Sequence, residues 1–201
     1  MDDSSASGGL WGGRFTEGPA PELDKINRSL PYDWRLWRYE LQVNRAWLEE
    51  LVRVEVLPDD TADVLRRGLN AVADRLEAGS PGGEPDEDIH SLIERWLEEE
   101  VGSDASLVRL GRSRNDVVAT DTRLWAMDAA ARIDASCRAL QAGIVETAAR
   151  LIDDVIPAYT HLQQAQPTRA AHWLLSHFWP LERNRQRLDD ATARMNWLPL
   201  G

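Results

Sequence analysis

The sequence is poor in cysteine: Cys137 is the only one among its 201 residues, so no disulfide can form within the chain. A single cysteine is typical of a reducing compartment, and we expect a cytoplasmic location. Long apolar runs are absent too, because no segment approaches the ~18 consecutive apolar residues of a membrane span. Residues 1–9 lack the basic and apolar regions of a signal peptide, and we expect them to be a disordered tail. No membrane partner is therefore expected.

Basic charge and metal-ligand patterns are also scarce. The net charge is −11 and no basic stripe is present, which argues against a nucleic-acid partner. His172 and His177 are five positions apart and so lie on different faces of a helix, and His90 stands among acidic residues in no metal motif. Without cysteines and histidines at ligand spacing, we predict no metal and no cofactor. An anionic substrate would need local arginines to overcome the negative field of the chain.

Runs of β-branched and aromatic residues are few, so the sequence offers little for strands. The composition is ordinary for a globular protein, with 43% hydrophobic and 28% charged residues. A chain of this length can bury one sizeable core, and we predict an all-α protein with essentially no strand. Nine tryptophans, mostly within helical patterns, are expected in the core or at subunit interfaces.

Apolar residues recur at helical spacing through 34–54, 59–76 and 89–101, which predicts three amphipathic helices. A shorter helix is expected within 22–30, and the glycine- and proline-rich segment 78–85 predicts a loop. The candidate N-caps of the three amphipathic helices are aspartates: Asp33, Asp59 or Asp60, and one of Asp86 to Asp88.

The two longest segments with a helical pattern are 114–155 and 167–197. The first contains no proline, and Pro157 follows its end. Between them, residues 159–166 are predicted to form a polar loop, with the second helix beginning at Pro167 and kinked at Pro180. Two long helices with apolar faces predict a bundle, and other helices or other subunits must cover those faces.

The segment 111–116, Gly-Arg-Ser-Arg-Asn-Asp, lies at the start of the longest helix and has two interpretations. Ser113 followed three residues later by Asp116 resembles a capping box, and arginines on a turn are usually solvated. Alternatively, Arg112, Arg114 and Asn115 form an anion site together with the free backbone N–H groups of the helix start. A carboxylate would be the ligand of such a site.

The segment 159–167, Tyr-Thr-His-Leu-Gln-Gln-Ala-Gln-Pro, also has two interpretations. Thr160, His161 and Gln163 could together hold a carboxylate and move a proton. Equally, the polar side chains of a loop could serve only to bond its own backbone. The residue types alone leave both interpretations open.

These segments together resemble the argininosuccinate lyase family. The resemblance covers nearly the whole chain, and its motifs agree in order and spacing. They are Leu10–Phe15 (Leu-Trp-Gly-Gly-Arg-Phe), Asn27–Asp33, Glu87–His90, Gly111–Asp116, Tyr159–Gln163 and Leu198–Gly201.

The resemblance implies a long-helix bundle of the fumarase/aspartase type and a homotetramer whose active sites form where three subunits meet. It implies an N-terminal helical domain over 10–111 and the start of the central bundle domain over 112–201. The implied reaction is β-elimination of argininosuccinate to arginine and fumarate, in arginine biosynthesis. His161 matches the family's acid–base histidine. The implied substrate-binding and supporting residues are Ser29, Arg112, Ser113, Arg114, Asn115, Thr160 and Gln163.

The sequence also departs from the family pattern. Arg109 and Leu110 stand where the family has His-Thr, and Val43 and Asn44 stand where it has Gly-Ser. The family's later loop, with its catalytic serine, has no counterpart before Gly201, so we expect the isolated chain to be inactive. Three alternatives stay open: a truncated non-catalytic relative, a subunit completed by a separate chain, and a lyase of another succinate adduct.

Overall fold

The structure is a computed structural model that describes residues 20–79 and 85–199. The chain divides into two compact units, one of residues 1–122 with 199–201 and the other of residues 123–198. The predicted tail 1–9 and the motif Leu10–Phe15 lie outside the described residues, as do parts of the predicted loop 78–85 and of the motif Leu198–Gly201.

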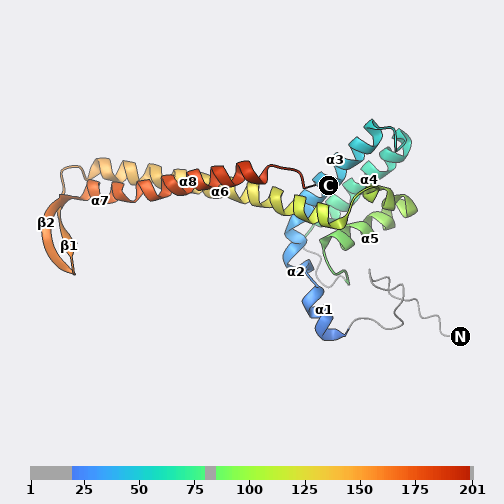
Figure 1. Ribbon diagram of the computed structural model, residues 1–201, viewed down its shortest axis with the longest axis horizontal. Helices are drawn as coiled ribbons and strands as arrows, with labels where there is room; N and C mark the ends of the chain where they lie inside the picture. Colours follow the sequence, from blue (N-terminus) through green and yellow to red (C-terminus); the bar gives the residue numbers. More distant parts are fainter. Residues whose placement is uncertain (1–19, 80–84, 200–201) are drawn as a thin grey trace. The chain divides into compact units, whose positions relative to one another are not determined.

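The first unit is helical in its described residues (Figure 1). The three predicted amphipathic helices are confirmed as α3, α4 and α5, although the turn before α3 is a 3₁₀ helix. The elements are α1 (Pro21–Asn27), α2 (Leu30–Asp33), η2 (Trp34–Leu36), α3 (Trp37–Arg53), α4 (Asp59–Glu77), α5 (Ile89–Val101), η3 (Gly102–Arg109) and the beginning of α6 (Arg114–Arg150).

The helix starts confirm the predicted capping only in part. Asp88 caps α5, because its Oδ1 accepts a hydrogen bond from the backbone N–H of Ser91 at 2.8 Å. Pro58 is the N-cap of α4, and the two aspartates that follow lie in the first turn, where they still favour the helix dipole. Asp33 makes no capping bond at its own helix; instead its Oδ1 accepts from the backbone N–H of Ile89 at 3.1 Å. It therefore links α2 to the start of α5.

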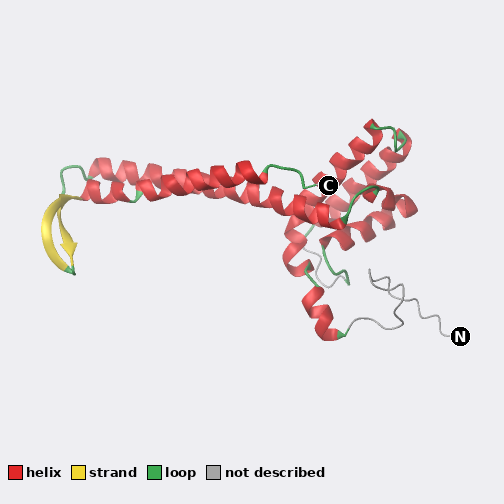
Figure 2. Cartoon of the chain, viewed as in Figure 1, coloured by secondary structure: helices red, strands yellow, loops and turns green. Residues whose placement is uncertain are grey.

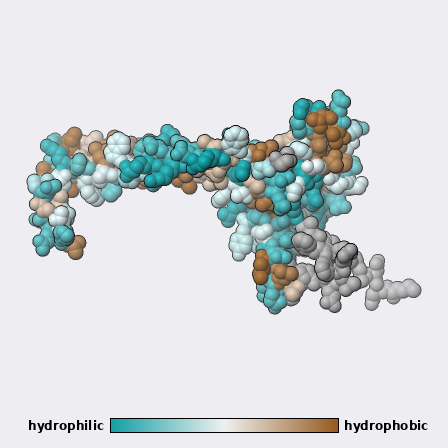
Figure 3. Space-filling model, viewed as in Figure 1, coloured by the Kyte–Doolittle hydropathy of each residue, from teal (hydrophilic) through white to brown (hydrophobic). Residues whose placement is uncertain are grey.

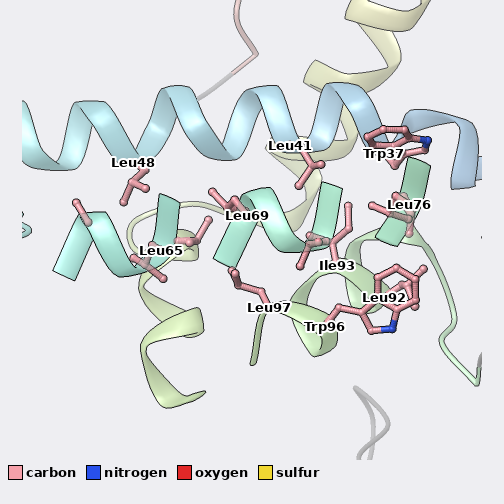
Figure 4. Packing of buried hydrophobic residues seen from close by; sticks show 14 of the residues in the cluster. Trp37, Leu41, Leu48, Leu65, Leu69, Leu76, Leu92, Ile93, Trp96 and Leu97 are labelled. Carbon is pink, nitrogen blue, oxygen red and sulfur yellow. The ribbon is translucent and has the colours of Figure 1, made fainter. Parts of the chain in front are cut away.

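The hydrophobic core of this unit lies between α3, α4 and α5 (Figure 4). Its side chains come from the predicted apolar faces, and removing one leucine from such a core typically costs about 2–5 kcal/mol. The fully buried residues include Leu41, Leu48, Leu65, Leu69, Val72, Leu76, Ile89, Leu92 and Ile93.

Gly68 allows α4 to lie close to α5. A Cβ at this position would stand 2.5 Å from Cγ1 of Val101 and 2.7 Å from Cδ1 of Leu97, so no larger residue fits without a shift. Close approach of the two helices therefore depends on the missing side chain.

The described tryptophans range from buried to largely exposed. Trp37 and Trp96 belong to the core, as predicted. Trp173, Trp179 and Trp197 are more than half exposed, at 54%, 60% and 74%. Their placement at a subunit interface stays a prediction.

The second unit contains most of α6, a β-hairpin, α7 (Ala170–Ser176) and α8 (Phe178–Met195). Within it α6 and α8 lie side by side (Figure 1). Arg185 of α8 donates from Nε to Oδ1 of Asp134 in α6 at 2.7 Å, and Gln141 of α6 donates to Oε2 of Glu182 at 3.1 Å. Figure 3 shows a mainly hydrophilic face over α8. Exposed apolar residues on α6 include Ile133, Leu140 and Val145.

The expectation of essentially no strand is wrong for 155–169. Strands β1 (Val155–Thr160) and β2 (Gln163–Arg169) pair as an antiparallel hairpin, shown in Figure 2, where a polar loop was predicted. Pro157 faces Pro167 across the hairpin. A two-stranded ribbon tolerates both prolines, because each strand has a free edge that needs no N–H donor.

The long helices also differ from their predicted bounds. α6 ends at Arg150, five residues before the predicted end, and the second helical segment begins at Ala170. That segment breaks at His177, between α7 and α8, and not at Pro180. Pro180 lies in the first turn of α8, where the absent N–H would have had no helical partner anyway. No helix of residues 20–79 and 85–199 is long and apolar enough to cross a membrane.

Candidate active site

The segment 111–116 combines features of both of its interpretations. The backbone N–H of Ser113 donates to Oδ2 of Asp116 at 3.1 Å, and the N–H of Asn115 donates to Oγ of Ser113 at 3.3 Å, so the helix start is capped locally. Gly111 has φ 74°, a left-handed conformation that favours glycine and turns the chain into α6. Ser113 is thus occupied in capping, whereas the two arginines have other partners.

Arg114 ties the start of α6 to the start of α5. Its Nη2 donates to Oδ1 of Asp88 at 2.9 Å and to Oγ of Ser91 at 2.8 Å. Its Nε is buried without a partner among the described residues, but Asp88 neutralises the charge of the guanidinium. Arg114 therefore supports the turn more directly than it attracts an anion.

Arg112 is the better candidate for an anion ligand. Its Nη2 donates to Oδ1 of Asn44 at 2.6 Å and to the carbonyl of Val108 at 2.7 Å, and the guanidinium lies 5.5 Å from the ring centre of Trp47. Its Nε and Nη1 are buried and have no partner among the described residues. Burial lowers the pKa of Arg112 from its usual value. Unused donors on a partly buried cation are the groups that a carboxylate would bind.

Ser29 lies beside the residues that lead into α5. Its hydroxyl donates to Oδ2 of Asp33 at 2.5 Å, and its backbone N–H donates to the carbonyl of Glu87 at 2.8 Å. Burial raises the pKa of Asp33, although the Ser29 hydroxyl acts in the opposite direction. The motifs 27–33 and 87–90 are thus in contact. The motif 111–116 reaches the same place, because Arg114 bonds Asp88.

A buried polar cluster adjoins Arg112 and was not predicted. His90 Nδ1 lies 2.6 Å from Oε2 of Glu40, and Asn44 donates from Nδ2 to Oε1 of Glu40 at 3.0 Å. Asp121 is completely buried beside them. No role was predicted for Glu40, Asn44 or Asp121, and His90 was considered only as a metal ligand and as part of the motif 87–90. The available signal was that Glu40 and Asn44 occupy positions on the apolar face of their helix, next to Trp37, Leu41 and Leu48.

The pKa values within this cluster move in different directions. Burial alone would raise the pKa of Glu40, but His90, together with hydrogen bonds from Asp121 and Asn44, outweighs it, and the pKa is lowered. Burial likewise opposes protonation of His90, but Glu40 raises its pKa overall. Burial, followed by the hydrogen bond and charge of Glu40, raises the pKa of Asp121 to about 10.

Glu40, His90 and Asp121 each offer one possible metal-ligand atom, and these atoms all lie within 4.8 Å of one another, so a metal site has to be considered. The 2.6 Å between Nδ1 and Oε2 is a hydrogen-bond distance. Two ligands of one tetrahedral zinc ion, each at ~2.1 Å from it, would stand about 3.4 Å apart. The cluster therefore has the geometry of a hydrogen-bonded network, with the positive charge of Arg112 alongside.

In the second unit, the hairpin brings Thr160, His161 and Gln163 together at its tip. Thr160 pairs with Gln163, and the two residues between them form the turn. His161 and Leu162 have φ 50° and 62°, and Leu162 is 98% exposed. Two-residue turns of this kind favour Asn-Gly, since both central positions need positive φ. His161 is thus exposed, in a left-handed backbone conformation that is uncommon for residues other than glycine but is adopted by histidine more often than by most.

Comparison with known proteins identifies the class. The chain matches the family Lyase_1, described as "Lyase", over residues 13–201, and it belongs to this family of lyases.

The curated relatives are more specific. The chain is 47% identical over 197 residues to "Argininosuccinate lyase" of Roseiflexus castenholzii, covering 96% of this chain, and 44% identical over 193 residues to "Argininosuccinate lyase" of Herpetosiphon aurantiacus. The resemblance inferred from the motifs is confirmed. The chain spans 42% of the length of both relatives.

Solved structures support the fold. An EDDS lyase variant with bound fumarate is similar to this chain with a TM-score of 0.72 and 28% identity, over 92% of this chain and 37% of that one. A fumarate lyase from Mesorhizobium sp. BNC1 has a TM-score of 0.68 at 18% identity, over 92% of this chain and 43% of that one, which shows the shared fold alone. The predicted all-α fold of the fumarase/aspartase type is confirmed, apart from the hairpin.

Proposed function

We propose that the chain forms the N-terminal part of an argininosuccinate lyase, which splits argininosuccinate into arginine and fumarate in arginine biosynthesis. The observation that carries the proposal is Arg112, whose Nε and Nη1 are buried without a partner among the described residues. The identity to curated argininosuccinate lyases supports the choice of substrate.

The proposed reaction is a β-elimination. A base removes a carbon-bound proton next to a carboxylate of the succinate part, and negative charge builds on that carboxylate. The electron pair then forms the double bond of fumarate, the C–N bond breaks, and the leaving nitrogen of arginine takes a proton. Donors placed where the negative charge develops stabilise the transition state, and Arg112 is such a donor.

The remaining site residues take supporting or binding roles in this proposal. Asn115 and Ser29 bind the substrate from the first unit, and Arg114 and Ser113 hold the turn that presents Arg112. From the hairpin, His161 acts as the acid–base group, with Thr160 and Gln163 binding beside it. The exposed tip of the hairpin supports a site completed between subunits, and we propose a cytoplasmic homotetramer.

A lyase acting on a different succinate adduct is the second candidate. It is favoured by Arg109, which stands where the family has histidine and pairs with Oε2 of Glu94 at 2.5 Å. Asn44, which stands where the family has serine, accepts a hydrogen bond from Nη2 of Arg112. Both departures lie near the proposed anion site, and an EDDS lyase is among the similar structures.

The test follows fumarate release by its ultraviolet absorbance. We expect no turnover of argininosuccinate by this chain alone, and turnover when it is mixed with the remaining C-terminal part of the Roseiflexus castenholzii relative. His161→Asn in this chain should abolish the restored turnover. Release of fumarate only from other N-substituted succinates would favour the second candidate. Failure with every adduct, in a mixture shown to assemble, would contradict both and favour a non-catalytic relative.

A further inference from the structure

Asp121 of α6 is a buried acid without a partner for its charge. It is 0% exposed, and as a carboxylate neither of its oxygens has a hydrogen-bond donor among the described residues. Ionised groups in such a position are costly unless a donor or an opposite charge compensates them. The arrangement around Asp121 therefore needs a proton or a cation.

Three titratable groups from different elements lie around Asp121. Glu40 extends from α3, His90 from α5 and Arg112 from the turn before α6. Arg112 favours the ionised form of Asp121, but burial and Glu40 oppose it more strongly. Farther out, Asp88 and Arg114 act on His90 with opposite signs.

Glu40 is the ionised member of the two acids. It already accepts from Asn44 at Oε1 and from His90 at Oε2, and an ionised carboxylate is the form that accepts such bonds. A second carboxylate in the same dry space would be repelled, and two close acids typically share one proton. A proton on Asp121 supplies the donor that its unpartnered oxygens lack.

We infer that Asp121 keeps a proton at neutral pH and donates it to Glu40 in a hydrogen bond, and that Glu40 and Asn44 are positioning residues for Arg112. Asn44 connects Glu40 to Arg112. Its Nδ2 donates to Glu40, which fixes the amide so that its oxygen accepts from Arg112 Nη2 at 2.6 Å. Nη2 is thereby occupied, and Nε and Nη1 stay unpartnered for an anion.

The shared proton does not depend on the proposed function. The purpose of positioning Arg112 does, because it assumes that Arg112 binds the substrate. Both tests below use the whole chain and measure no lyase activity. If the proposed function proves wrong, the results of both tests can therefore still be interpreted.

The first test compares urea unfolding of the wild type and Asp121→Asn from pH 5 to 9. Asparagine has the shape of the protonated acid and cannot ionise. Between those pH values the wild-type native state binds one proton that its unfolded state lacks, so rising pH favours unfolding of the wild type. Its unfolding constant should rise relative to the variant's by up to about tenfold per pH unit. Parallel profiles would overturn the shared proton.

Two controls sharpen this test. Asp59→Asn changes an exposed aspartate in the first turn of α4, and its profile should run parallel to the wild type. The same unfolding series is repeated with Zn²⁺ and with EDTA. Stabilisation of the wild type, but not of Asp121→Asn, by Zn²⁺ would show a metal site in place of the shared proton, and would overturn the inference.

The second test measures Arg112 by ¹H–¹⁵N NMR. Its Nε–Hε signal is assigned by its loss in Arg112→Lys. Asn44→Ala should speed exchange of this proton by about tenfold or more, because the hydrogen bond that orders the guanidinium is lost. Asn70→Ala, which removes an exposed asparagine that accepts from Arg45 at 2.9 Å, should leave it unchanged.

Asn44→Ser, the family's residue at this position, serves as a second variant where Asn44→Ala does not fold. It should also speed exchange, because serine is too short to span Glu40 and Arg112 at the observed geometry. An Arg112 signal unchanged in a folded Asn44 variant would overturn the positioning role.

Discussion

Arg112 and Asn44 are 68 positions apart in the chain, and their side chains are joined by a hydrogen bond of 2.6 Å between Nη2 and Oδ1. The bond links the turn before α6 to the buried face of α3. It places the guanidinium of Arg112, with its unpartnered Nε and Nη1, beside the cluster of Glu40, His90 and Asp121. The candidate anion site is thus supported from inside the first unit, and Glu40, Asn44 and Asp121 belong to none of the motifs that first indicated it.

Arg114 is expected to matter for stability. Replacing it by methionine removes charged hydrogen bonds to Asp88 and Ser91, both of which are partly buried, and should lower the free energy of unfolding by about 1–3 kcal/mol. Arg53→Met removes an exposed pair with Glu50 and should cost much less, because solvent screens that pair. Urea unfolding of the two variants measures the difference. Equal effects would show that the Arg114 contacts contribute no more than a surface pair.

Two glycines in helices should respond in opposite ways to alanine. Gly68→Ala places a Cβ 2.5 Å from Val101 and should destabilise by about 1–3 kcal/mol through overpacking. Gly143→Ala meets nothing within 4 Å and should stabilise by about 0.5–1 kcal/mol through helix propensity. Thermal unfolding followed by circular dichroism checks both. A stable Gly68→Ala would mean that α4 and α5 are not in close contact.

His90 should titrate above its usual range. Because Glu40 raises the pKa of His90, the protonated imidazole stabilises the native state fully below about pH 6.5, and this contribution is lost as the pH rises through the native pKa. An NMR titration of the His90 ring should give a midpoint above about 6.5. In Glu40→Gln, burial acts without the opposing charge and the midpoint should fall below that of the wild type. A midpoint unaffected by Glu40→Gln would contradict the pairing.

The hairpin turn stores backbone strain that glycine should relieve. Leu162 has φ 62° and is almost fully exposed, so Leu162→Gly loses no packing within the chain and should stabilise the hairpin by about 1 kcal/mol. Gln164→Gly, within β2, should weaken it instead. Hydrogen exchange of the strand amides reports both effects. If Leu162→Gly lowers protection, the leucine contacts another copy of the chain in the assembly.

The sequence was sufficient for the elements that rest on periodicity. The apolar faces of α3, α4 and α5 recur every three or four residues, and their bounds were predicted to within a few residues. The hairpin was missed because its strand 163–169 is almost wholly polar and exposed, so it carries no alternating pattern. The pairing is decided by the turn at His161 and Leu162, which has none of the usual glycine signal.

The site was predictable only where motifs carried it. Arg112 and Arg114 share a motif, yet the charge of Arg114 is paired with Asp88, whereas Arg112 keeps both Nε and Nη1 unpartnered among the described residues. This difference depends on neighbours distant in sequence. The roles of Glu40 and Asp121 could not be derived, since a buried acid shows in the sequence only as a polar residue on an apolar face. Its partner lies on a different helix.

The most direct measurement of the central claim compares Arg112→Met with Arg109→Met in the assembly restored with the C-terminal part of the relative. Arg112 should bind the carboxylate on which charge develops, so Arg112→Met should lower kcat/KM for argininosuccinate by about 10²–10³-fold. Arg109→Met should lower kcat/KM by less than tenfold, because Arg109 is already paired with Glu94. Equal losses in the two variants, or full activity of a folded Arg112→Met, would contradict the assignment of Arg112 as the substrate's anion ligand.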